Sequence, residues 1–177
     1  DFLENFLKFR EDVVIKRTKF DLKKAEERVH ILLGLSVSVE NIDKVIKIIR
    51  SSKNPEEAKN SLLKTTWKIN KASKLIKLVD SKNYKGKYVL SNDQVTSILE
   101  LRLQKLTAIG INEIEIEIKK LATEISKYKK IINSKNELLS VISNDLQMIK
   151  DKFSVPRRTK IIDAVLNYDI EETIQKE

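Results

Sequence analysis

The sequence reads INEIEIEIKKLATEISKYKKII from residue 111 to residue 132, and this stretch decides the fold. Its apolar side chains recur at alternating steps of three and four residues: Ile111, Ile114, Ile118, Leu121, Ile125, Tyr128 and Ile132. An unbroken repeat of this kind is the pattern by which one helix packs knobs-into-holes against another. We therefore expect a long helix that has a long helical partner.

The start of the chain supplies a candidate for that partner. Neither Gly nor Pro occurs from Phe2 to Leu33, and Gly34 is the expected helix stop. Such a helix would be about 45 Å long at ~1.5 Å per residue. Its apolar stripe changes face partway, from Phe2, Phe6, Phe9 and Val13 to Leu22, Ala25, Val29 and Leu32. This change predicts that the first helix meets two different partners.

Shorter helices are expected between the two long ones. Residues 42–50 have the spacing of an amphipathic helix, and Asn54 followed by Pro55 is a capped helix start. Ser91 with Gln94 forms a capping box for a helix that we expect to run from Asn92 to about Leu106. Segment 64–90 stays unassigned: its apolar residues from Trp67 to Leu78 could form a helix, whereas Lys85-Gly86-Lys87 resembles an exposed turn.

The return helix is expected to break once before it ends. Ser134 with Glu137 is a second capping box, so a new helix should begin after it, and Pro156 should follow the end of that helix. Gly and Pro together number only five, which leaves little turn chemistry for a many-stranded sheet.

These signals predict an all-α fold, a long antiparallel coiled coil that carries a small helical globular head. We divide the chain into a first arm, 1–34; a head, 35–110; a returning arm, 111–155; and a tail, 156–177. The chain begins within a helix and without an initiator Met, so we expect a piece of a longer protein whose tail leads to a further domain.

The charge balance favours anionic partners. The chain has 35 basic and 26 acidic residues, a net charge of +9, which suits phosphate backbones or an anionic membrane. The alternative is that lysines simply solvate helical surfaces. Cysteine is absent, which suits a reducing cytoplasm, and no apolar run approaches the ~18 residues of a membrane span. We expect a cytoplasmic protein that has no membrane partner.

A search for catalytic chemistry finds no candidate. The sequence has no Gly-rich phosphate loop, no metal-ligand cluster and no nucleophile with a matching base. The single histidine, His30, lies among apolar residues, so we interpret it as a packing or capping residue. We expect no catalytic, cofactor or metal site in this chain.

The helix that follows Ser91 offers a candidate dimer contact. At ~100° per residue, Val95, Leu99, Leu103 and Leu106 form the face that packs inward. A second face is predicted as a homodimer interface and comprises Gln94, Ile98, Leu101, Arg102 and Lys105. The alternative is that another helix of the same head covers this face.

Four separated strings of the sequence stand out, in order. Residues 10–35 include REDVVIKRT and AEERVHILLGL, residues 41–59 include NIDKVI, IRSS and PEEAK, residues 98–107 read ILELRLQKLT, and residues 156–159 read PRRT. Together they resemble the A subunit of DNA gyrase, a type IIA DNA topoisomerase. Segment 64–90 has no clear match, and Ala108 and Lys160 stand where the family usually has Gly and an acid.

The resemblance implies the coiled coil and exit gate of an enzyme that passes one DNA duplex through a double-strand break in another. It implies dimerisation at the gate, partnership with the B subunit of gyrase and with double-stranded DNA, and use of ATP and Mg²⁺ through other domains. The catalytic tyrosine of that family would lie outside this chain. The A subunit of topoisomerase IV is the nearest alternative, a non-enzymatic coiled-coil scaffold is another, and a membrane-surface role is a third.

Overall fold

A computed structural model describes residues 1–69, 71–79, 87–101 and 111–161. Within the described residues the contacts form two compact units, one up to Ile142 and the other from Ser143 onward. The described elements are α1 (Phe2–Glu40), α2 (Ile42–Ser51), α3 (Pro55–Lys64), β1 (Thr66–Lys68), α4 (Lys71–Val79), β2 (Lys87–Val89), α5 (Asn92–Glu100), α7 (Ile111–Asn133) and α8 (Lys135–Phe153). The predominantly helical fold is therefore confirmed.

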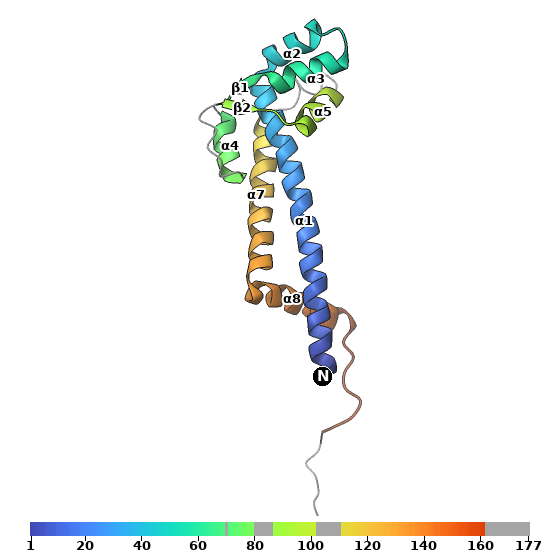
Figure 1. The fold of residues 1–177 in the computed structure, drawn as a ribbon. Helices are drawn as coiled ribbons and strands as arrows, with labels where there is room; N and C mark the ends of the chain where they lie inside the picture. Colours follow the sequence, from blue (N-terminus) through green and yellow to red (C-terminus); the bar gives the residue numbers. More distant parts are fainter. Residues whose placement is uncertain (70, 80–86, 102–110, 162–177) are drawn as a thin grey trace, which may run out of the picture. The chain divides into compact units, whose positions relative to one another are not determined.

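Helices α1 and α7 lie side by side and run in opposite directions (Figure 1). Glu11 of α1 pairs with Lys135 at the start of α8, whereas Arg28, farther along α1, pairs with Glu117 near the start of α7. Glu26 pairs with Lys129 between them. Because all of these side chains are partly or largely exposed, the ion pairs fix the alignment of the helices more than they stabilise the fold.

The heptad repeat of α7 places its residues from Ile114 to Tyr128 in or against the core, as expected. Ile114, Ile118 and Ile125 are buried, and Leu121 and Tyr128 pack against the same core. The side chain of Ile111 lies outside the described residues. At the other end the prediction is wrong, since Ile131 rather than Ile132 is buried, in a second cluster with Val14, Leu138 and Ile142. The buried residue that follows Tyr128 therefore lies three positions farther along the helix and not four, in the cluster that α7 shares with α1 and the start of α8.

Gly34 does not stop the first helix, which continues to Glu40. A Cβ atom at position 34 would lie only 2.7 Å from Cγ of Gln94. The glycine therefore permits close approach of a neighbouring side chain rather than a change of backbone direction. The helix ends instead at Asn41, whose amide side chain donates to the carbonyl of Val37 at 2.8 Å.

The two apolar stripes of α1 have different outcomes. Ala25, Val29 and Leu32 of the second stripe are buried in the main core. The first stripe does not find a partner within the described residues, because Phe2 is 81% exposed and Phe9 is 65% exposed. Val14 and Thr18 are the buried residues of that half of the helix.

The all-α prediction missed a small antiparallel ribbon in the unassigned segment. Strands β1 and β2 pair with Trp67 opposite Tyr88, and both of these side chains are buried. Trp67 donates its indole N–H to the carbonyl of Leu62 at 3.3 Å. We call residues 42–100 of the described chain the α2–α5 body; it shares one core with α1 and α7. The four-part division of the chain stays a prediction.

The predicted helix starts are confirmed at Asn54, Ser91 and Ser134. Asn54 accepts a hydrogen bond from the backbone N–H of Glu57 at 2.8 Å, and Ser91 and Gln94 form both bonds of a capping box. Ser134 accepts from the N–H of Glu137 at 3.4 Å, and α8 ends at Phe153, before Pro156.

The Asn54 cap yields the first testable prediction. Asn54→Ala removes the acceptor for the Glu57 N–H and should lower the free energy of unfolding by about 1 kcal/mol. Asn60→Ala, on an exposed position inside the same helix, is the matched control and should be neutral or slightly stabilising, because alanine is the better helix former. Urea denaturation followed by circular dichroism measures both variants. Equal destabilisation by the two would contradict the capping role.

Candidate functional site

Two of the predicted site residues, Gln94 and Ile98, lie on α5, which packs on α1. The two elements approach closely at one point, where Gly34 faces the side chain of Gln94. Gln94 is 1% exposed although its side chain is polar. A buried amide of this kind must have its hydrogen bonds made within the protein.

Gln94 makes three side-chain hydrogen bonds, each to a different element. Its Nε2 donates to the backbone carbonyl of His30 on α1 at 2.7 Å and to the hydroxyl of Tyr88 on β2 at 2.9 Å. Its Oε1 accepts from the backbone N–H of Ser91 at 2.9 Å. One side chain therefore joins α1, the ribbon and the start of α5.

His30 belongs to the same network. Its Nε2 and the hydroxyl of Ser91 share a hydrogen bond of 2.7 Å. Ser91 is the N-cap of α5, so the histidine helps to hold the residue that starts that helix. The prediction that His30 is a packing or capping residue is confirmed.

The predicted second face of α5 is wrong for two of its five residues. Gln94 and Ile98 are both 1% exposed and lie inside the protein's own core, so they do not project toward a partner. Leu101 is half-buried and packs against the same core. Arg102 and Lys105 lie outside the described residues. The dimer contact itself stays a prediction.

The error has two parts, the length of α5 and the face through which it docks on α1. The prediction assumed one helix from Asn92 to Leu106, but α5 ends at Glu100 and Leu101 has an extended backbone with ψ of 131°. Gln94 carried a usable signal, because the glutamine of a capping box turns back to its own helix start. That orientation removes it from an outward face.

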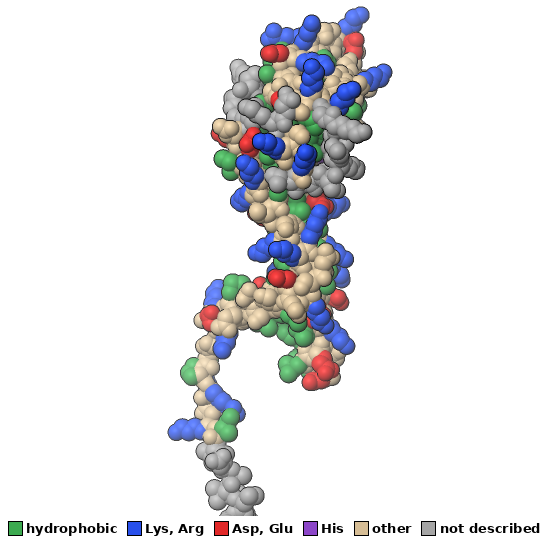
Figure 2. Space-filling view, turned by 90° about the vertical axis from the view of Figure 1, so that its left-hand side faces the viewer, with side chains coloured by type: hydrophobic (Ala, Val, Ile, Leu, Met, Phe, Trp, Pro, Cys, Tyr) green, Lys and Arg blue, Asp and Glu red, His purple; other side chains and the backbone are tan. Residues whose placement is uncertain are grey.

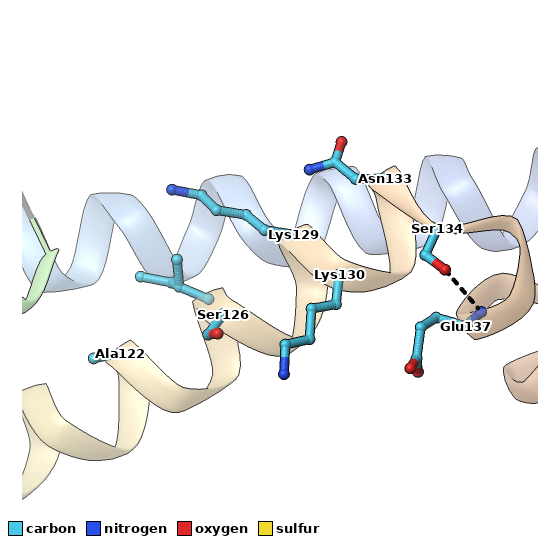
Figure 3. A pocket seen from close by; sticks show the side chains of 8 residues that line it. Ala122, Ser126, Lys129, Lys130, Asn133, Ser134 and Glu137 are labelled. Atoms are coloured by element: carbon cyan, nitrogen blue, oxygen red, sulfur yellow. Dashed lines mark hydrogen bonds between the residues drawn. The ribbon is translucent and has the colours of Figure 1, made fainter.

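The described surface has an open groove of about 540 Å³ at the junction of α7 and α8. Its lining residues are Ala122, Ile125, Ser126, Lys129, Lys130, Asn133, Ser134 and Glu137. Figure 3 shows Lys130 and Glu137 pointing to one side of the junction, whereas Lys129 extends toward α1, where it meets Glu26. Among these lining residues, Ser134 accepts a hydrogen bond from the backbone N–H of Glu137 and so caps the start of α8.

One ionisable side chain near the helix pair has a perturbed pKa. Partial burial, followed by the nearby carboxylates of Glu124 and Asp21, raises the pKa of Tyr128 above its ordinary value. The hydroxyl therefore stays neutral, as suits its packing against the core of the helix pair.

Metal-binding clusters and membrane-spanning helices are both absent from the described residues. Those residues contain no group of three or more His, Cys, Asp or Glu side chains that could hold a metal ion. In the same part of the chain, none of the helices combines the length and the apolar character required to cross a membrane.

The sequence has clear relatives. Residues 1–147 match the family of DNA gyrase and topoisomerase IV A subunits. The chain is 43% identical over 175 residues to the DNA gyrase A subunit of Rickettsia felis, and the match covers 97% of the chain and 19% of that protein. It is 38% identical over 188 residues to the DNA gyrase A subunit of Haemophilus influenzae, with 100% of the chain and 21% of that protein covered.

The relative from Clostridium acetobutylicum, also named as the A subunit of DNA gyrase, is 37% identical over 175 residues, with 99% of the chain covered. The chain thus spans about a fifth of the length of the curated relatives it matches.

Proposed function

This chain belongs to the family of DNA gyrase and topoisomerase IV A subunits, and on that premise we propose that it is part of the A subunit of a DNA gyrase. The proposed enzyme is an ATP-dependent type II topoisomerase, an isomerase that passes one duplex through a double-strand break in another. The names of the relatives support gyrase, while the family as a whole also includes topoisomerase IV.

Within that enzyme we assign the chain to the wall of the DNA cavity and to its dimeric exit gate. The observation that carries this assignment is the antiparallel pair of α1 and α7, which shares its core with the compact α2–α5 body. We interpret the helix pair as the coiled-coil arm and the α2–α5 body as the head. A rigid arm with a small dimerising head can hold two subunits together while the duplex between them is cut.

The remaining chemistry would belong to parts of the enzyme outside this chain. The catalytic tyrosine, ATP and Mg²⁺ would act there, and the B subunit of gyrase would be a partner in a complex with two copies of each polypeptide. Double-stranded DNA is the proposed substrate, so we also propose a cytoplasmic location. The alternative from a different class is a coiled-coil dimerisation scaffold without enzymatic activity.

Dimerisation tests the gate assignment. Sedimentation velocity of the 177-residue chain at micromolar concentration should give the mass of a dimer, since a standard interface buries roughly 1,600 Å². If the chain stays monomeric at micromolar concentration, the gate assignment is rejected and only the assignment to the arm remains.

A substitution at Leu101 locates the contact. Leu101→Asp should raise the dimer dissociation constant at least tenfold, roughly 1.4 kcal/mol, because a carboxylate would have to be desolvated in the interface. Circular dichroism and the urea midpoint of the monomer are measured on the same sample, because Leu101 also packs on the core. Thr96→Ala, on the solvent side of α5, is the control. An unchanged dimer would move the contact away from Leu101.

A further inference from the structure

The net charge of the chain is concentrated in one short segment. Residues 64–87 contain eight lysines and one aspartate, a balance of +7 out of the +9 of the whole chain. By contrast, residues 1–40, which include α1, contain eight basic and eight acidic residues. Residues 111–142 contain six lysines and five glutamates. The helix pair is therefore nearly neutral, and the charge belongs to the segment that forms β1, α4 and β2.

The fold exposes four of these lysines, on the ribbon and α4, to solvent. In the ribbon, Trp67 and Tyr88 point inward, and their neighbours Lys68 and Lys87 are exposed on the opposite face. In α4 the buried residues include Leu75 and Ile76, while Lys74 and Lys77 are exposed. Helix α4 and the ribbon lie next to each other (Figure 1). We call the four exposed lysines, Lys68, Lys74, Lys77 and Lys87, the lysine face.

The register of the ribbon sets two of these charges directly opposite each other. Lys68 pairs with Lys87 across the two strands, and both lie on the exposed face. Like charges at facing positions destabilise a sheet. An anionic partner that bridges the two ammonium groups would relieve this repulsion.

The lysine face has no carboxylate partner within the described residues. The ion pairs of the described residues occur on α1, α7 and α8 and involve none of the four lysines. Figure 2 shows Lys and Arg side chains distributed over the α2–α5 body with few Asp or Glu side chains among them. In the part of the chain that the structure describes, charge is thus neutralised along the helix pair and left unpaired on the β1–α4–β2 segment.

We propose that the lysine face binds the phosphate backbone of duplex DNA and that it does so without reading sequence. This inference rests on the proposed function, in which a duplex must pass the α2–α5 body to leave the enzyme. Lysine ammonium groups on flexible stems suit such a contact, because phosphate contacts position a duplex without specifying its bases. The surface would hold the departing duplex near the gate through charges that salt can screen.

Two variants of equal charge test the proposal. The first changes all four residues of the lysine face to glutamine, and the matched control changes Lys16, Lys19, Lys120 and Lys127, which are exposed on α1 and α7 and have no ion pair in the described chain. Both variants lose the same four charges. Lys74, Lys77 and the four control residues are helical, where glutamine and lysine have similar propensities, and Lys68 and Lys87 are exposed positions of the ribbon. The folds should therefore be preserved, and circular dichroism verifies this.

The readout is binding of the chain to a fluorescent duplex of about 30 base pairs as salt is raised. We expect the lysine-face variant to bind at least tenfold more weakly and its log–log salt slope to fall by up to ~3.6, at about 0.9 for each phosphate group that is no longer neutralised. The control should change affinity by less than about threefold, because its lysines make few of the contacts that set this slope.

Three results would overturn the proposal: equal weakening in both variants, no binding of the duplex by the parent chain, or binding of phosphatidylglycerol vesicles in place of DNA. Sedimentation of the same samples tests the dimeric gate of the proposed function separately from DNA binding by the lysine face. A dimer that does not bind DNA would reject DNA binding by the lysine face and leave the gate assignment intact. A monomer that binds DNA through the lysine face would reject the gate assignment and leave DNA binding intact.

Discussion

Replacement of Gln94 by methionine is expected to lower the free energy of unfolding by about 2–4 kcal/mol. Methionine is unbranched and of similar length, so the variant keeps most of the packing and removes the three side-chain hydrogen bonds to His30, Tyr88 and Ser91. Each such bond contributes about 0.5–1.5 kcal/mol net, and a buried group left without its partner costs more. The substitution should also loosen α5, because its capping box is broken.

The single tryptophan of the chain provides the measurement. Trp67, on β1, is fully buried, so its fluorescence reports unfolding of the α2–α5 body in urea. Thr96→Ala is the matched control, because Thr96 bonds only to its own helix at Asn92, and it should change stability by about 0.5 kcal/mol or less. Titrations at two protein concentrations separate a folding effect from a dimer effect.

An alternative outcome would restore the original prediction for Gln94. If the residue were a dimer contact, Gln94→Met would weaken association and leave the urea midpoint of the monomer unchanged. The structure predicts the reverse, a lower midpoint at every concentration, because the side chain is buried within one protomer.

The helices were predictable because their signals are local. The heptad repeat from Ile114 to Tyr128, the Asn54 cap and the Ser91–Gln94 capping box each depend on residues a few positions apart. The end of α7 was not predictable in this way. There Ile131, and not Ile132, lies in the core, in a cluster where α8 packs on Val14. That contact joins residues more than a hundred positions apart, and periodicity within one helix contains no information about it.

The ribbon was missed for a related reason. Strands β1 and β2 have three residues each, too few for an alternating pattern to be recognised. Their pairing is fixed by burial of Trp67 and Tyr88 against the rest of the core, which is a tertiary effect. The basic character of the same segment was visible in the sequence, but its meaning depended on knowing which lysines remain unpaired.

The site was only partly predictable. Leu101 was predicted to lie in a dimer interface and is half-buried, so that contact stays a prediction, whereas Gln94 and Ile98 were placed on the wrong side of the helix. The face of a short helix follows from where it docks, and α5 docks through Gly34. A glycine in a helical run has two local interpretations, a stop or a close approach, and the residue it approaches lies 60 positions farther along the chain.

Replacement of Gly34 by valine is expected to lower the free energy of unfolding by about 2–3 kcal/mol. A Cβ atom there would lie 2.7, 2.8 and 2.9 Å from Cγ, Cβ and Cδ of Gln94. Gln94 cannot move away at low cost, because the hydrogen bonds to His30, Tyr88 and Ser91 hold its side chain. Valine and glycine are both poor helix formers, so improved propensity offsets little of the clash.

A double-mutant cycle distinguishes close approach from a helix stop. Gly34→Ala is combined with Gln94→Gly, which removes the atoms that the new methyl group would meet. If the close approach explains the glycine, Gly34→Ala should destabilise the parent but be neutral or stabilising beside Gln94→Gly, with a coupling energy of about 2 kcal/mol. If the glycine instead served a backbone conformation that alanine resists, its replacement would cost the same whatever residue stands at position 94. Urea denaturation of the four proteins, followed through Trp67 fluorescence, decides between the two, because only the steric explanation makes the penalty at Gly34 depend on Gln94.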